Sequence, residues 1–166
     1  MRVFGISGLS GSGKTTLVEQ LVKALRSKGY SVATVKSSKD DNSSPEGTDS
    51  WRHERAGADP VIFLGPHTTS IRYATRLRIV DILKGQDIDF LLIEGFKEEH
   101  LPKIWCTGNR AIDPKDIPPT TVAIVTWADS PLDLKSMKKP VLGIKDIERV
   151  TQVVMKEATD ISLLEI

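Results

Sequence analysis

The stretch GLSGSGKTT, residues 8–16, constrains the fold of this 166-residue chain more than any other feature. It matches the pattern G-x-x-x-x-G-K-[ST], with Gly8, Gly13, Lys14 and Thr15 in the fixed positions. Glycines let the backbone take positive φ angles and approach a ligand closely, so successive N–H groups would point at phosphate oxygens. Lys14 would reach the β- and γ-phosphates, and the Thr15 hydroxyl would bind Mg²⁺. The stretch therefore predicts a phosphate-binding loop.

The residues on both sides of this loop support the prediction. The apolar run VFGIS that starts at Val3 predicts a strand before the loop. After it, apolar residues recur with helical spacing as far as Gly29, at Leu17, Val18, Leu21, Val22 and Leu25. The N-terminus of that helix would bring its positive end to the same phosphates. Strand, loop and helix in this order are the context that the motif requires.

The rest of the chain alternates between predicted strands and predicted helices. Strands are predicted at 30–36, 59–65, 68–74, 88–96, 103–107, 121–127 and 140–144, and helices at 48–58, 75–85 and 147–158. Within 88–96 the run is almost continuously apolar, which is typical of a strand buried on both faces of a parallel sheet. We therefore expect an α/β protein with the P-loop NTPase fold, a mostly parallel sheet with helices on both faces, and a single domain over residues 1–166.

Composition narrows the class of protein further. The chain is 39% hydrophobic and 27% charged, which is typical of a soluble globular protein, and its net charge of +1 favours neither a nucleic-acid nor a membrane partner. Its single cysteine, Cys106, cannot form an internal disulfide. The first predicted strand begins at the second residue, which leaves no room for a signal peptide, so we expect a cytoplasmic protein.

Three side chains are candidates for binding Mg²⁺ or contacting the phosphates. Glu94 ends the strand FLLIE, at the edge of the sheet where a P-loop protein needs a carboxylate near Mg²⁺; the alternative is a solvated glutamate. Asp49 follows the polar loop after the second strand and would bind Mg²⁺ or respond to the γ-phosphate; the alternative is a helix N-cap. Lys36, at the end of the second strand, would contact a phosphate or simply be solvated.

Asp129 is the candidate for reading the nucleotide base. It lies in the loop TWAD after a predicted strand, and a carboxylate there would accept hydrogen bonds from N1 and N2 of guanine, donors that adenine lacks. The usual guanine-reading signature has Asn-Lys before the Asp, whereas this loop has Thr-Trp, so a plain turn aspartate stays an alternative. We expect Trp51, Trp105 and Trp127 to pack rather than to stack on a ligand.

With these pieces placed, the sequence resembles the molybdopterin-guanine dinucleotide biosynthesis protein B family. The resemblance rests on GISGLSGSGKTTLVEQLV at the start, GTDSWRHERAGA in the middle and DFLLIEGFKEEHLPKI later, in that order, with VAIVTWAD as a weaker match. It implies a GTP-binding protein with slow hydrolysis, usually a homodimer. Such a protein assists the partner guanylyltransferase that joins GMP to molybdopterin in molybdenum or tungsten cofactor synthesis.

The resemblance also implies roles for particular residues. Thr15 and Glu94 would hold Mg²⁺, Asp49 would belong to the nucleotide-responsive segment, and Lys14 with Glu94 would be the catalytic pair. The phosphates would be held by Gly8, Leu9, Ser10, Gly11, Ser12, Gly13, Lys14, Thr15 and Thr16. Lys97 and Lys103 would meet the pterin phosphate, or else be solvated surface lysines.

This chain departs from the family at one segment, and two other functions stay open. Family members commonly carry a histidine-rich segment such as KHTHHD after the second strand, whereas residues 36–42 here read KSSKDDN. One alternative is a small-molecule kinase that uses the same loop with ATP or GTP. The other is a binding module with negligible catalysis, in which residues 37–47 become ordered around the γ-phosphate and recruit a partner.

Overall fold

The computed structural model describes residues 1–97, 100–109, 113–127 and 139–163. The chain divides into two compact units. The first joins Met1–Ser37 to the chain from Gln86 onward, and the second is Ser38–Gly85. That the whole chain forms one domain stays a prediction.

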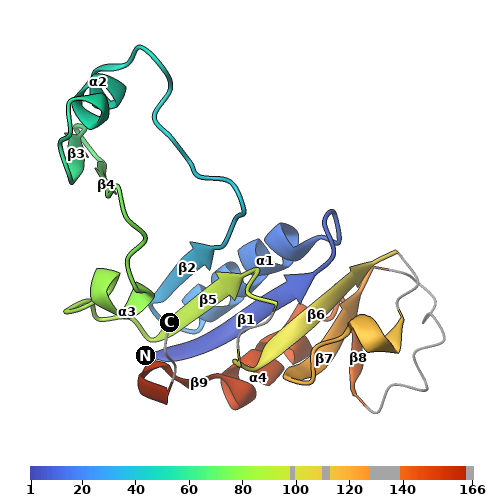
Figure 1. The fold of residues 1–166 in the computed structure, drawn as a ribbon. Helices are drawn as coiled ribbons and strands as arrows, with labels where there is room; N and C mark the ends of the chain where they lie inside the picture. The colour runs from blue at the N-terminus through green and yellow to red at the C-terminus, as the bar shows by residue number, and fades with distance from the viewer. Residues whose placement is uncertain (98–99, 110–112, 128–138, 164–166) are drawn as a thin grey trace. The chain divides into compact units, whose positions relative to one another are not determined.

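The first unit is built on a seven-stranded sheet in the order β2-β5-β1-β6-β7-β8, with β9 beside β1 (Figure 1). The strands along this path are parallel, and β9 is antiparallel to β1. Their bounds are Arg2–Gly8 for β1, Val32–Lys36 for β2, Phe90–Glu94 for β5, Lys103–Gly108 for β6, Thr121–Thr126 for β7, Val141–Gly143 for β8 and Thr159–Asp160 for β9. The predicted α/β class with a mostly parallel sheet is confirmed.

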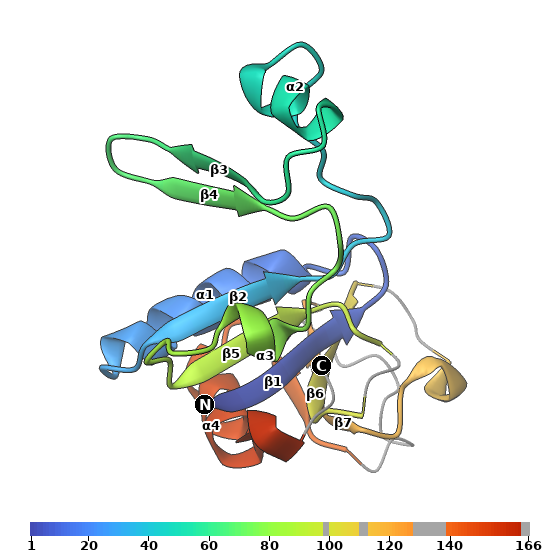
Figure 2. The same ribbon diagram turned by 60° about the vertical axis from the view of Figure 1, so that its left-hand side comes forward.

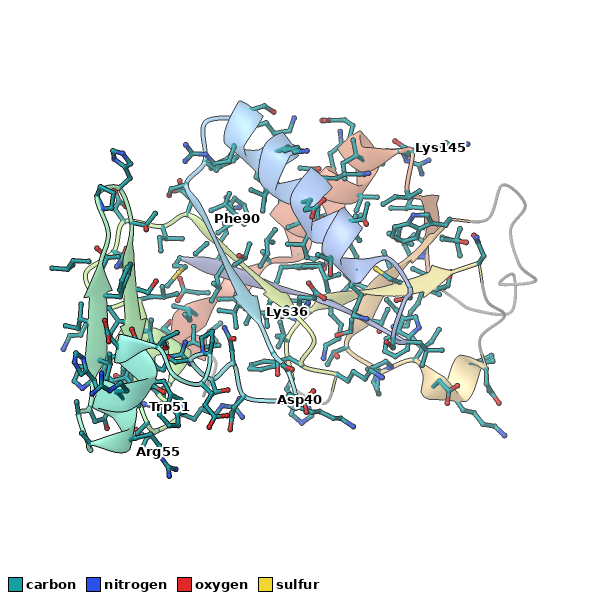
Figure 3. All side chains as sticks on the ribbon, turned by 90° about the horizontal axis from the view of Figure 1, so that it is seen from above. Lys36, Asp40, Trp51, Arg55, Phe90 and Lys145 are labelled. Carbon is teal, nitrogen blue, oxygen red and sulfur yellow. The ribbon has the colours of Figure 1, made fainter. Side chains whose placement is uncertain are left out.

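Two helices, α1 (Lys14–Ser27) and α4 (Ile147–Glu157), pack against each other over this sheet (Figure 3). Helix α4 begins where the Asp146 carboxylate accepts a hydrogen bond from the Arg149 N–H at 3.4 Å. The core between helices and sheet contains Phe4, Ile6, Leu17, Leu21, Leu25, Ile104, Cys106, Val150 and Val154, all fully buried. In the described part of the chain, no helix is long and apolar enough to cross a membrane.

The opposite face of the sheet carries a different set of side chains. Because side chains alternate along a strand, Lys103 and Trp105 of β6 lie on the face away from Ile104. Both are buried, with exposed fractions of 0% and 2%. Gly5 of β1 makes room there, since a Cβ atom at this position would lie 2.9 Å from the Leu101 side chain. The short 3₁₀ helix η1 (Pro114–Asp116) follows later in the chain.

The second unit contains α2 (Asp49–Arg55), β3 (Val61–Leu64), β4 (Thr69–Arg72) and α3 (Ile79–Ile82). The two predicted strands here are confirmed, but they form a separate antiparallel hairpin (Figure 2). The helix predicted at 75–85 is wrong in extent, because Arg78 has extended backbone with ψ 142° and only four residues after it are helical. The side chains of Glu54 on α2 and Arg72 on β4 form an ion pair of 2.9 Å.

Candidate functional site

The glycine-rich loop runs from the end of β1 to the start of α1, as predicted. Gly13 has left-handed backbone (φ 80°, ψ 17°) directly before the helix, and its carbonyl accepts the first helical hydrogen bond from Leu17 at 3.0 Å. Any residue with an L side chain would be strained there. The Nζ of Lys14 donates to the Leu9 carbonyl at 2.7 Å, so the lysine lies across the loop. The loop therefore has the backbone form that a phosphate cradle needs.

The loop also rests tightly on the end of β6. A Cβ atom on Gly8, whose φ is 146°, would lie 2.3 Å from the Cys106 carbonyl oxygen. Ser12 is 2% exposed, and a Cβ atom on Gly108 would lie 3.3 Å from its Cα. The close approach of backbone to backbone fixes the loop against the sheet and admits no larger residue at Gly8.

Thr15 and Glu94, both predicted as Mg²⁺ ligands, meet in the structure. The Thr15 hydroxyl donates to the Glu94 carboxylate, with oxygen–oxygen distances of 2.9 and 3.1 Å. Parallel pairing of β5 with β1 brings them together, because it places Glu94 opposite Ile6, just before the loop. Lys36 ends β2, and its Nζ lies 3.8 Å from a Glu94 oxygen. Glu94 is thus no isolated solvated glutamate, since its side chain is 12% exposed.

This donor set fits Mg²⁺ of the kind that accompanies a nucleotide. A hydroxyl and a carboxylate are oxygen ligands, and Mg²⁺ is typically bound through one or two protein groups plus phosphates and water. Within residues 1–97, 100–109, 113–127 and 139–163, no group of three or more His, Cys, Asp or Glu could hold a metal by itself. The protein oxygens of Thr15 and Glu94 would therefore hold the ion together with phosphate oxygens.

The structure describes Asp49 but not Asp129. Asp49 is the first residue of α2 in the second unit, and its side chain is 91% exposed. The alternative that it caps this helix is wrong, because Thr48 does so by accepting from the Trp51 N–H at 3.3 Å. A role for Asp49 at Mg²⁺ stays a prediction. Asp129 lies outside the described residues, and its role as base reader stays a prediction too.

Lys103 lies in a place that neither sequence-based alternative predicted. It is fully buried, and its Nζ donates to the carbonyls of Phe96 at 2.7 Å and Lys97 at 2.8 Å. The solvated-lysine alternative is therefore wrong for Lys103, and its amine is enclosed rather than open to a phosphate. The signal was a lysine at the start of the apolar strand KIWC, where a buried amine must find backbone acceptors.

Lys97, by contrast, is exposed, as the solvated alternative expected. Its Nζ lies 5.7 Å from the centre of the Trp105 ring. Both residues line a cavity of about 310 Å³ together with His100, Asp116, Pro118, Pro119 and Thr120. A contact between Lys97 and a pterin phosphate stays a prediction.

Cys106 lies in β6 beneath the loop. Burial raises the pKa of its thiol to about 12, although the nearby Lys14 charge acts in the opposite direction. A thiol with this pKa carries almost no thiolate at neutral pH, and the thiolate is the nucleophile. Cys106 therefore serves as a small apolar core residue here.

Comparison with known proteins identifies a family for this chain. The sequence model of the family described as Molybdopterin guanine dinucleotide synthesis protein B matches residues 3–127. A Molybdopterin-guanine dinucleotide biosynthesis adapter protein of Haemophilus influenzae is 33% identical over 158 residues, covering 91% of this chain and 84% of that protein. The protein of the same description in Escherichia coli is 28% identical over 159 residues, covering 89% and 87%.

Solved structures agree on the fold. Bacillus subtilis MobB superposes with a TM-score of 0.71 at 19% identity, covering 96% of this chain and 99% of that one. A MobB homologue from Bacillus stearothermophilus gives a TM-score of 0.63 at 24% identity, covering 95% and 97%. The family model and the adapter-protein relatives do not favour the small-molecule kinase alternative.

Proposed function

Because this chain belongs to the family of molybdopterin guanine dinucleotide synthesis protein B, we propose that it is a GTP-binding adapter in the biosynthesis of that dinucleotide. The main support for nucleotide binding is the hydrogen bond between the Thr15 hydroxyl and the Glu94 carboxylate beside the glycine-rich loop. The phosphates lie in the cradle of residues 8–16, and Lys14 moves from the Leu9 carbonyl to the β- and γ-phosphates.

Thr15 and Glu94 hold Mg²⁺ in this proposal, and Asp49 responds to the γ-phosphate. The ion, when bound, offsets the negative charge that develops on the phosphates. We assign no separate base or arginine finger to the attacking water, so hydrolysis is slow unless a partner supplies the missing group. The protein then acts mainly through its nucleotide-bound state, in the cytoplasm, on molybdopterin or on the guanylyltransferase that uses it.

We test this by calorimetry with Mg²⁺, comparing GTP and ATP on the native protein, Lys14→Ala and Asp129→Ala. GTP should bind more tightly than ATP, Lys14→Ala should lose at least about tenfold for both, and Asp129→Ala should remove the preference for GTP. Lys23→Ala, an exposed lysine on α1, is the control and should bind as the native protein does. If neither nucleotide binds, nucleotide binding is wrong. If ATP binds as well as GTP, the guanine preference is wrong.

We also propose that two copies of the chain associate through the β3–β4 hairpin. Its large apolar side chains are exposed, with fractions of 55% for Ile62, 58% for Phe63, 75% for Leu64 and 53% for Ile71. The two strands pair only with each other within the described chain, and an apolar hairpin with open edges is a template for pairing. A second copy offers the same apolar surface, so the contact would be self-complementary.

Sedimentation equilibrium tests the dimer. The native protein should have twice the mass of one chain, and the double variant Phe63→Lys with Leu64→Lys should have the mass of one. Leu163→Lys is the control, because Leu163 is 74% exposed but lies in the first unit. A native monomer, or a double variant that stays dimeric, would rule out this interface.

A further inference from the structure

Trp127 is the first residue after β7, and it lies on the phosphate loop. Its backbone N–H donates to the Gly108 carbonyl at 3.2 Å, which continues the pairing of β7 with β6. A Cβ atom on Gly13 would lie 2.4 Å from Cζ2 and 2.7 Å from Cη2 of the indole. The ring thus packs directly on the last glycine of the loop, while Trp127 as a whole is only half-buried.

The sheet order sets the direction of a nucleotide bound to this loop. The Mg²⁺ position is marked by Thr15 and Glu94, and Glu94 ends β5 on one side of β1. Strand β7 lies on the other side of β1, beyond β6. Because Mg²⁺ and Lys14 take the β- and γ-phosphates, the ribose and base leave the loop at the end remote from Glu94. Trp127 is at that end.

We infer that the indole of Trp127 is the platform on which the base of the bound nucleotide stacks. This inference rests on the proposed nucleotide site at residues 8–16. A half-buried indole that is held on one side by Gly13 offers a rigid π-face, and a purine offers another. Stacking depends little on which base is present, so Trp127 contributes affinity for purine nucleotides and leaves the choice between guanine and adenine to other groups.

The position of Trp127 in the chain agrees with this role. In the usual guanine-reading signature the residue two before the Asp is a lysine, and in this loop Trp127 stands two before Asp129. From the sequence we expected Trp127 to pack rather than to stack on a ligand. It does pack, on Gly13 and against the core, but on the loop that binds the phosphates rather than deep in the sheet.

The experiment measures the contribution of the base to binding separately from that of the phosphates. Calorimetry with Mg²⁺ compares GTP, ATP and inorganic tripolyphosphate, which has the phosphates but no base, on the native protein, Trp127→Leu and Trp127→Phe. Leucine keeps an apolar side chain near Gly13 but removes the aromatic face, whereas phenylalanine keeps a face. Trp127→Leu should lose roughly 5- to 100-fold in affinity for GTP and ATP alike, with tripolyphosphate unchanged, and Trp127→Phe should recover most of the loss.

Intrinsic fluorescence gives a second readout. GTP should quench the tryptophan emission of the native protein, and tripolyphosphate should not. The quenching should be absent in Trp127→Phe, which keeps Trp51 and Trp105.

Other outcomes overturn the inference in distinguishable ways. If Trp127→Leu weakens tripolyphosphate as much as GTP, the indole only supports the loop. If the native protein binds GTP and Trp127→Leu binds it equally well, the stacking is wrong and the proposed function stands. If the native protein binds no GTP, both the stacking inference and the proposed GTP-binding function are wrong.

Discussion

The Nζ of Lys103 lies 2.7 Å from the carbonyl oxygen of Phe96, the residue after Glu94-Gly95. Phe96 has a φ of 46°, and among the described residues it alone has a positive φ without being a glycine. Left-handed backbone is costly for a bulky residue and persists only where the surroundings enforce it. The buried amine therefore holds the turn by which the chain leaves β5, directly after the Glu94 carboxylate.

Lys103→Met should lower the free energy of unfolding. Methionine fills a similar volume but donates no hydrogen bond, so the carbonyls of Phe96 and Lys97 lose their partner, which costs about 1–3 kcal/mol. Urea unfolding measures the change. Lys23→Met, at an exposed position on α1, is the control and should change the free energy by less than about 0.5 kcal/mol. Equal midpoints for both variants would contradict a structural role for Lys103.

Gly13→Ala and Gly11→Ala should differ sharply although both glycines have left-handed backbone, with φ of 80° and 71°. Each substitution costs about 1–2 kcal/mol in backbone strain. Only at Gly13 does the new Cβ meet the Trp127 ring, whereas at Gly11 nothing lies within 4 Å. Gly13→Ala should therefore lose a further 1–3 kcal/mol or so through overpacking. Urea unfolding with tryptophan fluorescence measures both, and similar losses would mean that the ring moves aside freely.

Much of the candidate site could be predicted from the sequence because the residues that define the loop are close together in the chain. The strand before the loop, the glycine spacing and the apolar stripe of α1 lie within 30 consecutive residues. Glu94 could be placed for a related reason, since it ends an apolar strand, and ligands of a parallel sheet bind at the carboxyl ends of its strands. The parallel pairing of β5 with β1 then brings Glu94 to the end of β1, beside the loop.

The features that could not be predicted depend on contacts between distant residues. From the sequence alone a lysine such as Lys103 is expected at the surface, and only the fold shows that the carbonyls of Phe96 and Lys97 accept hydrogen bonds from its amine. The apolar stretches of β3 and β4 look like sheet strands, and only their pairing with each other shows a separate hairpin. The helix at 75–85 was overpredicted because Leu77, Val80 and Leu83 follow helical spacing, while Arg78 is extended.

Cys106 should be unreactive in the folded protein. Burial raises the pKa of its thiol to about 12, so at pH 8 the thiolate fraction is far below that of an exposed cysteine. A disulfide reagent at pH 8 should modify the native protein at least about 100-fold more slowly than the protein in denaturant, where one thiol per chain should react. Rapid modification of the native protein would mean that β6 opens readily.

Asp89 should make the stability of the first unit depend on acid. Its carboxylate accepts hydrogen bonds from the Ser31 N–H at 2.8 Å and the Ser31 hydroxyl at 2.9 Å, and these bonds lower its pKa. A lowered folded-state pKa means stabilisation that is complete above the unfolded-state pKa, near 4, and is lost as the pH falls through the folded-state pKa. At pH 6 the native protein should therefore have a higher free energy of unfolding than Asp89→Asn.

Urea unfolding at pH 6 and at pH 3 checks this. The difference between the native protein and Asp89→Asn should shrink at pH 3, because the carboxyl becomes protonated. Asp87→Asn, two residues earlier and exposed, is the control and should show no such difference at pH 6. A pH-independent gap between native and Asp89→Asn would mean that the carboxylate's charge does not matter.

The central place of β1 in the sheet has a consequence for how the protein is made. Of the strands in this sheet β1 is synthesised first, yet its neighbours are β5, β6 and β9, which begin at residues 90, 103 and 159. At a synthesis rate of about 5–20 residues per second, the chain needs roughly 5 to 20 s to travel from β1 to β6. Throughout that time the glycine-rich loop has no strand to rest on. If the proposed site binds a nucleotide, a growing chain should bind it only after Gly108 has emerged, because only then is the strand that supports the loop complete.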